Sequence, residues 1–457
     1  MRKKALLAML LALTLLLSGC ALIVKDEAVD NATEIIRMGD QVITKDKVKA
    51  EVQNQLDSMA YTYSLYGYSY DTGSAENIAA AQEAAVSDLK KDLALTAKAA
   101  ELGLDQLTAE EEEEVKTNAQ ESYNSGLEYI KSYQLQDSGL EGEELDKAAA
   151  DALTEMGVTL DSYLESERKT LIDNKLRDYA IKDVTVSDDE IKAEYDSRVA
   201  SDKETYAENA GSWASAANNG TTLYYTPAGV RRVKQILTKF KDEDQTAIDD
   251  AKKAQTDANT AITTANAKIS AAQETLDTEG ITEEIQTQAE ADLKAANEEL
   301  EKANTDLDAA NKAVEDATNK AFESIAADAD EILKQLKDGA DWQTLMDEKN
   351  QDPGMKSNEK GYAVATGMTG FDSAFVDAAM ALAKPGDVSD KIKGSSYGYY
   401  IIRYDSDEAE GAVSLDDVKE TISSALLSTK QNEAYNAAKE QWVEEAGIKV
   451  DMNALKD

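Results

Sequence analysis

The sequence contains no histidine and only one cysteine, Cys20, among its 457 residues. A lone cysteine cannot close an intramolecular disulfide, so no part of the fold is stabilised by one. Transition metals are bound mostly by histidine and cysteine, and we therefore expect no metal site and no cofactor. The lack of histidine also removes the general base that a Ser-His-Asp hydrolase requires.

Basic residues are scarce relative to acidic ones. The chain has 48 Lys and Arg against 90 Asp and Glu, which gives a net charge of −42. Nucleic-acid backbones are bound by clustered Lys and Arg, so this balance excludes a nucleic acid as the partner. The hydrophobic fraction of 42% is sufficient for packed cores. The length predicts two or three domains.

After residue 20, no apolar run approaches the roughly 20 residues that a membrane-spanning helix needs. Residues 1–20 combine basic residues, an apolar run and a small-residue end, which is typical of a secretory signal peptide. The end of this segment, Leu17-Ser18-Gly19-Cys20, resembles the lipobox of bacterial lipoproteins. The resemblance implies cleavage before Cys20, lipidation of its sulfur, and a tether over 21–36 that holds the body at the outer face of the cell membrane. The alternative is an ordinary signal peptide with an incidental cysteine.

Helical periodicity dominates residues 37–199, which we predict to be a helical module. Apolar residues recur at steps of three and four from Val86 onward, and Gly103 marks the end of that helix. Two short strands around a Gly39-Asp40 turn precede the helices. Residues 200–227 are small, polar and aperiodic, so we expect a linker there.

Residues 245–317 have the pattern of an antiparallel coiled-coil hairpin. Alanine and leucine recur at alternating steps of three and four along two segments, and residues 277–282, with the sequence DTEGIT, separate them. Each arm has about 30 residues and so reaches roughly 45 Å. The alanine-rich seam allows close approach of the helices but buries little area in each layer.

Three further segments carry a family resemblance, namely VRRVKQILTKF, ADEILKQLKDGADWQTLMDEKNQD and FDSAFVDAAMALAKPGDVSDKIKGSSYGYYIIRYD. In this order they resemble a parvulin-type peptidyl-prolyl isomerase domain, which we place at 228–406 with the hairpin as an insertion. The flanking helices, including the one in 407–457, resemble the chaperone module of PrsA- and SurA-type foldases. The fold class expected is therefore α+β, with a mainly helical module around a parvulin-like domain.

The resemblance also implies site residues. The polar cluster of the family falls on Gln235, on Asp352 or the neighbouring Pro353, and on Tyr400, where Gln235 and Tyr400 replace the two family histidines. The proline-pocket positions fall on Phe371, Phe375 and, in a stretch that departs from the family pattern, Ala363. Glutamine and tyrosine still donate hydrogen bonds, and twisting an amide needs no titrating group.

We therefore expect an extracytoplasmic foldase that binds unfolded or proline-containing exported polypeptides and isomerises Xaa-Pro bonds without a cofactor. Two alternatives remain open at this stage. One is a non-catalytic holdase with a degenerate parvulin domain. The other is an envelope scaffold whose working part is the coiled coil.

Overall fold

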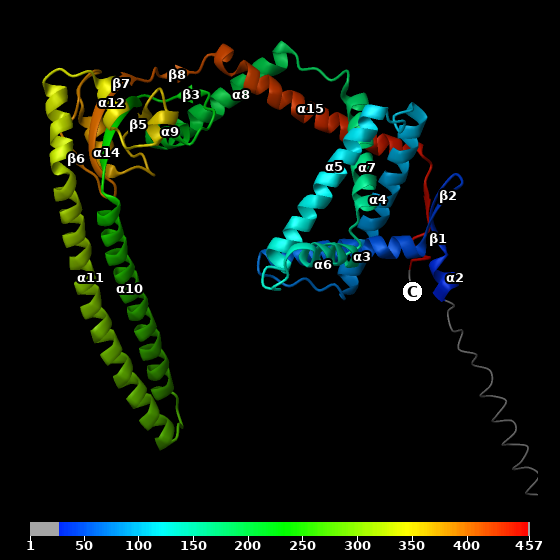
Figure 1. Cartoon of the computed structure of the whole chain (residues 1–457), viewed down its shortest axis with the longest axis horizontal. Coiled ribbons are helices and arrows are strands. Elements are labelled where there is room, and N and C mark those ends of the chain that lie inside the picture. Colours follow the sequence, from blue (N-terminus) through cyan, green and yellow to red (C-terminus); the bar gives the residue numbers. More distant parts are fainter. Residues whose placement is uncertain (1–26, 456–457) are drawn as a thin grey trace, which may run out of the picture. The chain divides into compact units, whose positions relative to one another are not determined.

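The structure is a computed structural model that describes residues 27–455. The expected signal peptide, the lipidation at Cys20 and the first part of the tether lie outside these residues. The described residues divide into two compact units, unit 1 (residues 27–186 and 424–455) and unit 2 (Ser187–Ser423) (Figure 1). Between residues 27 and 455, no helix has an apolar stretch of membrane-spanning length.

Unit 1 is built from both ends of the chain. Strand β1 pairs with β2 on one side and with the C-terminal strand β9 on the other, so Ile36 faces Val450. Tyr435 and Trp442 pack with residues of the N-terminal helices in a common core. The elements are α2 (Glu27–Asn31), β1 (Glu34–Met38), β2 (Gln41–Thr44), α3 (Lys45–Leu65), α4 (Ala75–Leu102), α5 (Ala109–Tyr129), the π-helix η1 (Ile130–Gln134), α6 (Gly142–Glu155), α7 (Leu160–Ile181), β9 (Lys449–Val450) and, from Ser424 on, α15 (Leu415–Glu445).

The folded part of unit 1 begins earlier than the sequence indicates. Residues 27–36, predicted as tether, hold α2 and the start of β1. Ile35 and Ile36 are fully buried in the core of this unit, because β1 is the central strand of its sheet.

Unit 2 contains a four-stranded antiparallel sheet of order β5-β4-β7-β6 and a two-stranded pair, β3-β8. The mixed helical and antiparallel content of the two units confirms the α+β fold class. The elements of unit 2 are α8 (Asp188–Tyr206), α9 (Ala210–Asn218), β3 (Tyr225–Thr226), β4 (Arg231–Lys239), α10 (Asp242–Leu276), α11 (Glu283–Lys337), α12 (Trp342–Lys349), α13 (Gly354–Ser357), β5 (Tyr362–Val364), α14 (Ser373–Ala381), β6 (Ile392–Lys393), β7 (Gly398–Asp407), β8 (Gly411–Ala412) and the start of α15.

The register of β4 and β7 decides which side chains share a face of the sheet. Gln235 faces Ile402 and Leu237 faces Tyr400, so these residues lie on one face because side chains alternate along a strand. We call this the α14 face, since Phe375 and Val376 of α14 pack there. Ile236 and Ile401 point to the opposite face, which α11 and α12 cover; we call it the α11 face.

The hairpin is formed as the sequence predicts. α10 ends at Leu276 and α11 begins at Glu283, so the connection is the expected residues 277–282. The seam consists of buried alanines spaced by seven residues on each arm: Ala251, Ala258, Ala265 and Ala272 on α10, and Ala289, Ala296, Ala303 and Ala310 on α11. The two arms project away from the sheet of unit 2 (Figure 1).

The base of the hairpin is fixed to the sheet by an aromatic cluster. The ring of Phe322 on α11 lies 4.8 Å from that of Phe240, directly after β4, and 5.0 Å from that of Tyr399 on β7. The buried Asp244 of α10 accepts a hydrogen bond of 2.6 Å from the Ser324 hydroxyl of α11. α11 continues without a break to Lys337, so one helix of 55 residues forms both an arm of the hairpin and a layer over the sheet.

Residues 200–227 differ from the predicted linker, because they hold the end of α8, all of α9 and β3. Trp213 of α9 is buried, and its Nε1 donates to the carbonyl of Tyr225 at 2.6 Å. Gly211 lies so close to the Gly367 backbone that a Cβ atom there would approach its carbonyl carbon to 2.4 Å. The small residues of this segment therefore permit close packing of a short helix.

Candidate active site on the α14 face

A cavity of about 400 Å³ opens on the α14 face of the unit 2 sheet. Its walls come from β4, from the turn between α12 and α13, from the start of β5, from α14 and the segment leading into it, and from the beginning of β7 with the residue before it. The lining residues are Gln235, Leu237, Lys239, Gln351, Asp352, Pro353, Tyr362, Gly370, Phe371, Asp372, Phe375, Tyr397 and Tyr400.

The structure brings together five of the six residues that the sequence places at the site. Gln235, Asp352, Phe371, Phe375 and Tyr400 all line this cavity.

The sixth, Ala363, is fully buried on β5 and does not contribute to the cavity wall. Its backbone exchanges two hydrogen bonds, of 2.8 and 2.9 Å, with the side chain of Asn218. Side chains alternate along β5, so the adjacent Tyr362 faces the cavity instead.

Four aromatic rings form the apolar part of the cavity. The ring of Phe371 lies 5.0 Å from that of Tyr362 and 5.9 Å from that of Phe375. Phe375 in turn lies 5.5 Å from Tyr400, with their planes at 67°. The Phe371–Tyr362 and Phe375–Tyr400 pairs are edge-to-face, and such pairs stabilise the packing beyond the area that they bury. The four rings therefore make a pre-formed apolar surface, which we call the aromatic seat.

The carboxylate of Asp352 connects the polar wall to this seat. Its Oδ2 accepts from Gln235 Nε2 at 2.7 Å and from the Tyr362 hydroxyl at 2.9 Å. Its Oδ1 accepts from the backbone N–H of Gly354 at 2.8 Å. The approach of Tyr362 requires glycine at 354, because a Cβ atom there would lie 1.9 Å from the hydroxyl oxygen.

Neighbouring polar groups hold the loop of Asp352 against β4. Asn350 Oδ1 accepts from the backbone N–H of Leu237 at 2.9 Å and from that of Asp352 at 3.1 Å. The Gln351 side chain accepts from the Lys239 N–H at 2.6 Å. The turn after α12 is therefore attached along β4, which fixes the carboxylate next to Gln235.

Gln235 keeps one buried polar atom without a partner. Its side chain is 6% exposed, and its Oε1 has no hydrogen-bond partner among residues 27–455. The orientation of the amide follows from its neighbour, because the carboxylate of Asp352 accepts only from the NH₂ side. Gln235 lines the cavity, so a ligand that brings an N–H or O–H donor to this oxygen would gain a hydrogen bond.

A second carboxylate, Asp372, faces Tyr400 across the cavity. The Tyr400 hydroxyl donates to Asp372 Oδ2 at 3.5 Å, the long end of the hydrogen-bond range. The same oxygen accepts from the Ser395 hydroxyl at 3.0 Å. Burial, reinforced by Asp372, raises the pKa of Tyr400 well above its usual value. Burial together with Asp352 does the same for the pKa of Tyr362, so both phenols stay protonated at neutral pH.

Ser396 belongs to a Gly-x-Ser-x-Gly pattern, Gly394-Ser395-Ser396-Tyr397-Gly398. This pattern lies in the turn between β6 and β7, and not in the strand-to-helix turn that exposes the nucleophile of hydrolases. With no histidine in the chain, the turn supplies no triad.

Sequence reasoning missed Tyr362 and Asp372. Tyr362 precedes Ala363 in the stretch already singled out, and the period of two along a strand is the signal that identifies it as the residue facing the cavity. Asp372 follows Phe371 directly and caps α14 by accepting from the N–H of Ala374, so it looks like a structural residue in the sequence. No group of three or more His, Cys, Asp or Glu side chains within residues 27–455 is arranged to hold a metal ion.

Comparison with known proteins identifies the domain that holds this cavity. Residues 309–406 match the family described as "Rotamase: PPIC-type PPIASE domain". The match begins inside α11, and β4 lies upstream of it because the hairpin separates that strand from the rest.

Two relatives are named as foldases. The "Foldase protein PrsA" of Clostridium botulinum (strain Hall) is 33% identical over 125 residues, which are 27% of this chain and 36% of that protein. The "Foldase protein PrsA 2" of Listeria innocua is 34% identical over 132 residues, 28% of this chain and 43% of that protein. The chain thus spans well under half the length of these curated relatives.

Among solved structures, the crystal structure of the foldase protein PrsA from Streptococcus pneumoniae is similar to this chain at 14% sequence identity and a TM-score of 0.27. The match includes 93% of this chain and 97% of that protein. The family match covers the segment that carries most of the cavity wall. Unit 2 of this chain therefore contains a domain of the PPIC-type, or parvulin, peptidyl-prolyl isomerase family.

Proposed function

We propose that unit 2 binds proline-containing segments of unfolded polypeptides and catalyses cis-trans isomerisation of their Xaa-Pro bonds. The observation that carries this proposal is the cavity of about 400 Å³, in which four aromatic rings adjoin the Gln235–Asp352 pair. Its volume lies within the range of about 300–1,000 Å³ that is usual for ligand sites. Its apolar half suits a pyrrolidine ring, and its polar half suits the adjoining peptide groups.

The reaction requires no covalent chemistry. The barrier to rotation, about 18–20 kcal/mol, comes from amide resonance, so a catalyst needs only to favour the twisted amide over the planar one. The aromatic seat would hold the proline ring and keep water from the amide. In the twisted state the proline nitrogen gains a lone pair that accepts a hydrogen bond.

Tyr400 is the donor best placed for this task. Its hydroxyl remains protonated and makes only a 3.5 Å hydrogen bond to Asp372, so it can turn toward an acceptor in the cavity at little cost. Gln235 Oε1, which has no partner among the described residues, would accept a peptide N–H of the substrate. Asp352 would hold Gln235 and Tyr362 in place.

The whole protein would then act as a foldase for exported polypeptides. The relatives named as PrsA foldases support this role, as does the signal-like segment of residues 1–20 with its lipobox ending at Cys20. In this proposal Cys20 carries lipid and anchors the protein at the outer face of the cell membrane. Unit 1, built from both ends of the chain, would supply additional binding surface for the client.

The replacement of both family histidines favours one alternative, a holdase that binds proline segments without accelerating isomerisation. A peptide assay separates the two functions. We expect the purified full-length protein to accelerate isomerisation of a short Xaa-Pro peptide. Phe371→Ala should lower kcat/KM by about tenfold, because it removes one wall of the seat, worth about 1.4 kcal/mol of contact with the ring.

The matched control is Ile285→Ala at the tip of the hairpin, where the side chain is 47% exposed and lies far from the cavity along α11. This variant should leave kcat/KM unchanged. Peptide binding without any acceleration by the unaltered protein would establish the holdase. The absence of both binding and acceleration would refute the assignment of the cavity.

A further inference from the structure

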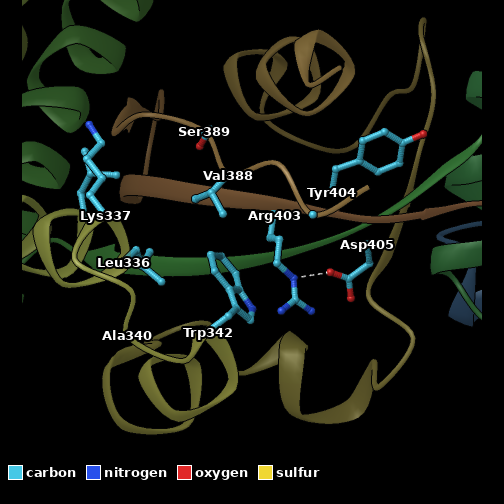
Figure 2. A pocket seen from close by; sticks show the side chains of 11 residues that line it. Leu336, Lys337, Ala340, Trp342, Val388, Ser389, Arg403, Tyr404 and Asp405 are labelled. Atoms are coloured by element: carbon cyan, nitrogen blue, oxygen red, sulfur yellow. Dashed lines mark hydrogen bonds and ion pairs between the residues drawn. The ribbon is translucent and has the colours of Figure 1, made fainter. Parts of the chain in front are cut away.

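A second and larger cavity, of about 560 Å³, lies on the α11 face of the sheet (Figure 2). The end of α11, the start of α12, the loop before β6 and the middle of β7 surround it. Leu333, Leu336 and Val388 supply its apolar surface. Arg403 is paired with Lys234, and the next pair along the two strands is Gln235–Ile402 on the α14 face. Because successive side chains point to opposite faces, Arg403 lies on the α11 face. The two cavities are therefore separated by the sheet.

One polar group in this cavity is buried and unpaired. Trp342 is 6% exposed, and its Nε1 has no hydrogen-bond partner within residues 27–455. The buried Trp213 of the same unit shows the usual arrangement, since its Nε1 donates to a carbonyl at 2.6 Å. An indole N–H can only donate, so Trp342 lacks an acceptor oxygen.

The guanidinium of Arg403 lies beside this indole (Figure 2), with its carbon 5.1 Å from the centre of the Trp342 ring. Arg403 Nε donates to Asp405 Oδ1 at 2.5 Å, whereas the two Nη groups have no hydrogen-bond partner in the described part of the chain. Asp405 is shared with a second cation, because Lys234 Nζ lies 3.8 Å from its other oxygen. The carboxylate of Asp341 also interacts electrostatically with Arg403, and Lys337 of the cavity wall pairs with Asp390 at 3.0 Å. The Nη edge of Arg403 is therefore distinguished by its unused N–H donors and not by a net charge of the cavity.

We propose that this cavity binds a client segment in which a carboxylate side chain, Asp or Glu, adjoins an aliphatic one. The carboxylate would accept from Trp342 Nε1 and from the free Nη edge of Arg403. The aliphatic side chain would contact Leu333, Leu336 and Val388. The inference rests on the proposed foldase function and deepens it, since it names a class of client sequence that would be bound at a site other than the proline cavity.

Hydrogen-bond complementarity favours this occupant over a neutral peptide. The Nη groups of Arg403 and the Nε1 of Trp342 are donors without an acceptor among residues 27–455, and those of Arg403 carry positive charge. A planar guanidinium presents paired N–H groups that match the two oxygens of a carboxylate, and a buried indole N–H strengthens the preference for an anionic acceptor. The volume accommodates a few residues and not a folded partner.

The test uses the full-length protein labelled with ¹⁵N and two peptides without proline, Ac-Ala-Leu-Glu-Leu-NH₂ and its Gln twin. The chain has three tryptophans, and Trp342→Phe identifies the indole N–H signal of Trp342. We expect the Glu peptide to shift this signal saturably. The Gln twin should bind at least about tenfold more weakly, which is the loss of one charge-assisted hydrogen bond. Added salt should weaken the Glu peptide's binding.

Arg403→Gln should abolish the preference for Glu over Gln, and Trp342→Phe, which retains the apolar ring, should weaken binding of the Glu peptide. Lys393→Gln is the matched control, because Lys393 lies over the Phe322 ring outside the cavity. Equal binding of the two peptides, or no saturable shift at millimolar peptide, would overturn the inference. Neither result bears on isomerisation, which the proline assay measures separately, and a lost isomerase activity with intact Glu-peptide binding would refute only the proposed catalysis.

Discussion

Replacing Asp352 by alanine should strongly destabilise unit 2. The carboxylate is the shared acceptor of Gln235 Nε2, at 2.7 Å, and of the Tyr362 hydroxyl, at 2.9 Å. These residues are only 6% and 9% exposed, so water cannot readily replace the lost acceptor. A buried donor left unpaired costs about 1–3 kcal/mol, and two of them predict a loss of about 2–6 kcal/mol. The loss is large against the usual 5–15 kcal/mol for the unfolding of a domain.

Asp352→Asn should cost much less. Asparagine can place its oxygen at the position of Oδ2, where it still accepts from both Gln235 Nε2 and the Tyr362 hydroxyl. Its NH₂ group then takes the position of Oδ1, so only the hydrogen bond from the Gly354 N–H to this side chain is lost. We expect a loss below about 1.5 kcal/mol, the net value of one ordinary hydrogen bond.

Urea unfolding followed by tryptophan fluorescence measures this difference. Trp442→Phe removes the only tryptophan of unit 1, so that the remaining Trp213 and Trp342 report on unit 2. With a slope of about 1–3 kcal/mol per molar urea, a loss of 3 kcal/mol moves the midpoint by about 1 M or more.

Equal midpoints for the alanine and asparagine variants of Asp352 would refute the reasoning, because they would show that no buried donor depends on this carboxylate. A double variant supplies an independent check. In a Gln235→Leu background one of the two donors is already absent, so Asp352→Ala should cost at least about 1 kcal/mol less than in the unaltered protein.

Three further predictions concern pH, the site and the hairpin. Because burial raises the folded-state pKa of Tyr362 and Tyr400, their contribution to stability is complete below pH 10 and is lost as the pH rises further, by up to about 1.4 kcal/mol per pH unit for each tyrosine; urea midpoints that do not fall above pH 10 would contradict this. Gln235→His should make kcat/KM vary with pH near 6.5, whereas the unaltered protein should show a flat profile from pH 6 to 8.5; identical profiles would exclude residue 235 from the reaction. Ala265→Leu overpacks the fully buried seam and should destabilise the hairpin by about 1–3 kcal/mol, seen as a lower melting temperature by circular dichroism. Ala267→Leu on the exposed side should leave the melting temperature unchanged. Equal effects of the two variants would mean that Ala265 is not in the seam.

The hairpin was predictable from the sequence because its cause is local. Alanines at a spacing of seven define a seam on each arm whatever the rest of the chain does, and the turn at 277–282 is the only interruption of that pattern. The strands β4 and β7 and the turn after α12 were recognisable through the family resemblance, which placed Gln235, Asp352 and Tyr400 on the segments that line one cavity.

The segment 200–227 was not predictable in the same way. Its small and polar residues are also typical of linkers, and the reason for them is tertiary. Gly211 permits contact with the backbone of another loop, and Asn218 imitates a strand edge by bonding both backbone groups of Ala363. The position of Tyr362 likewise depends on Gly354, a residue that approaches it only in the folded structure. Such pairings leave no periodic signal.

The unbroken course of α11 has a mechanical consequence. At 1.5 Å per residue its 55 residues make a rod of about 80 Å. Near the C-terminal end of α11, Ile332 packs against Ile236 and Ile401 of the sheet. Nearer the hairpin, Phe322 of the same helix packs against Phe240 and Tyr399. A force applied at the tip of the hairpin therefore acts on the sheet through a long lever arm, and α11 has no break at which it could bend. Whatever grips the far end of the hairpin applies torque to the very strands, β4 and β7, that form the wall of the aromatic cavity.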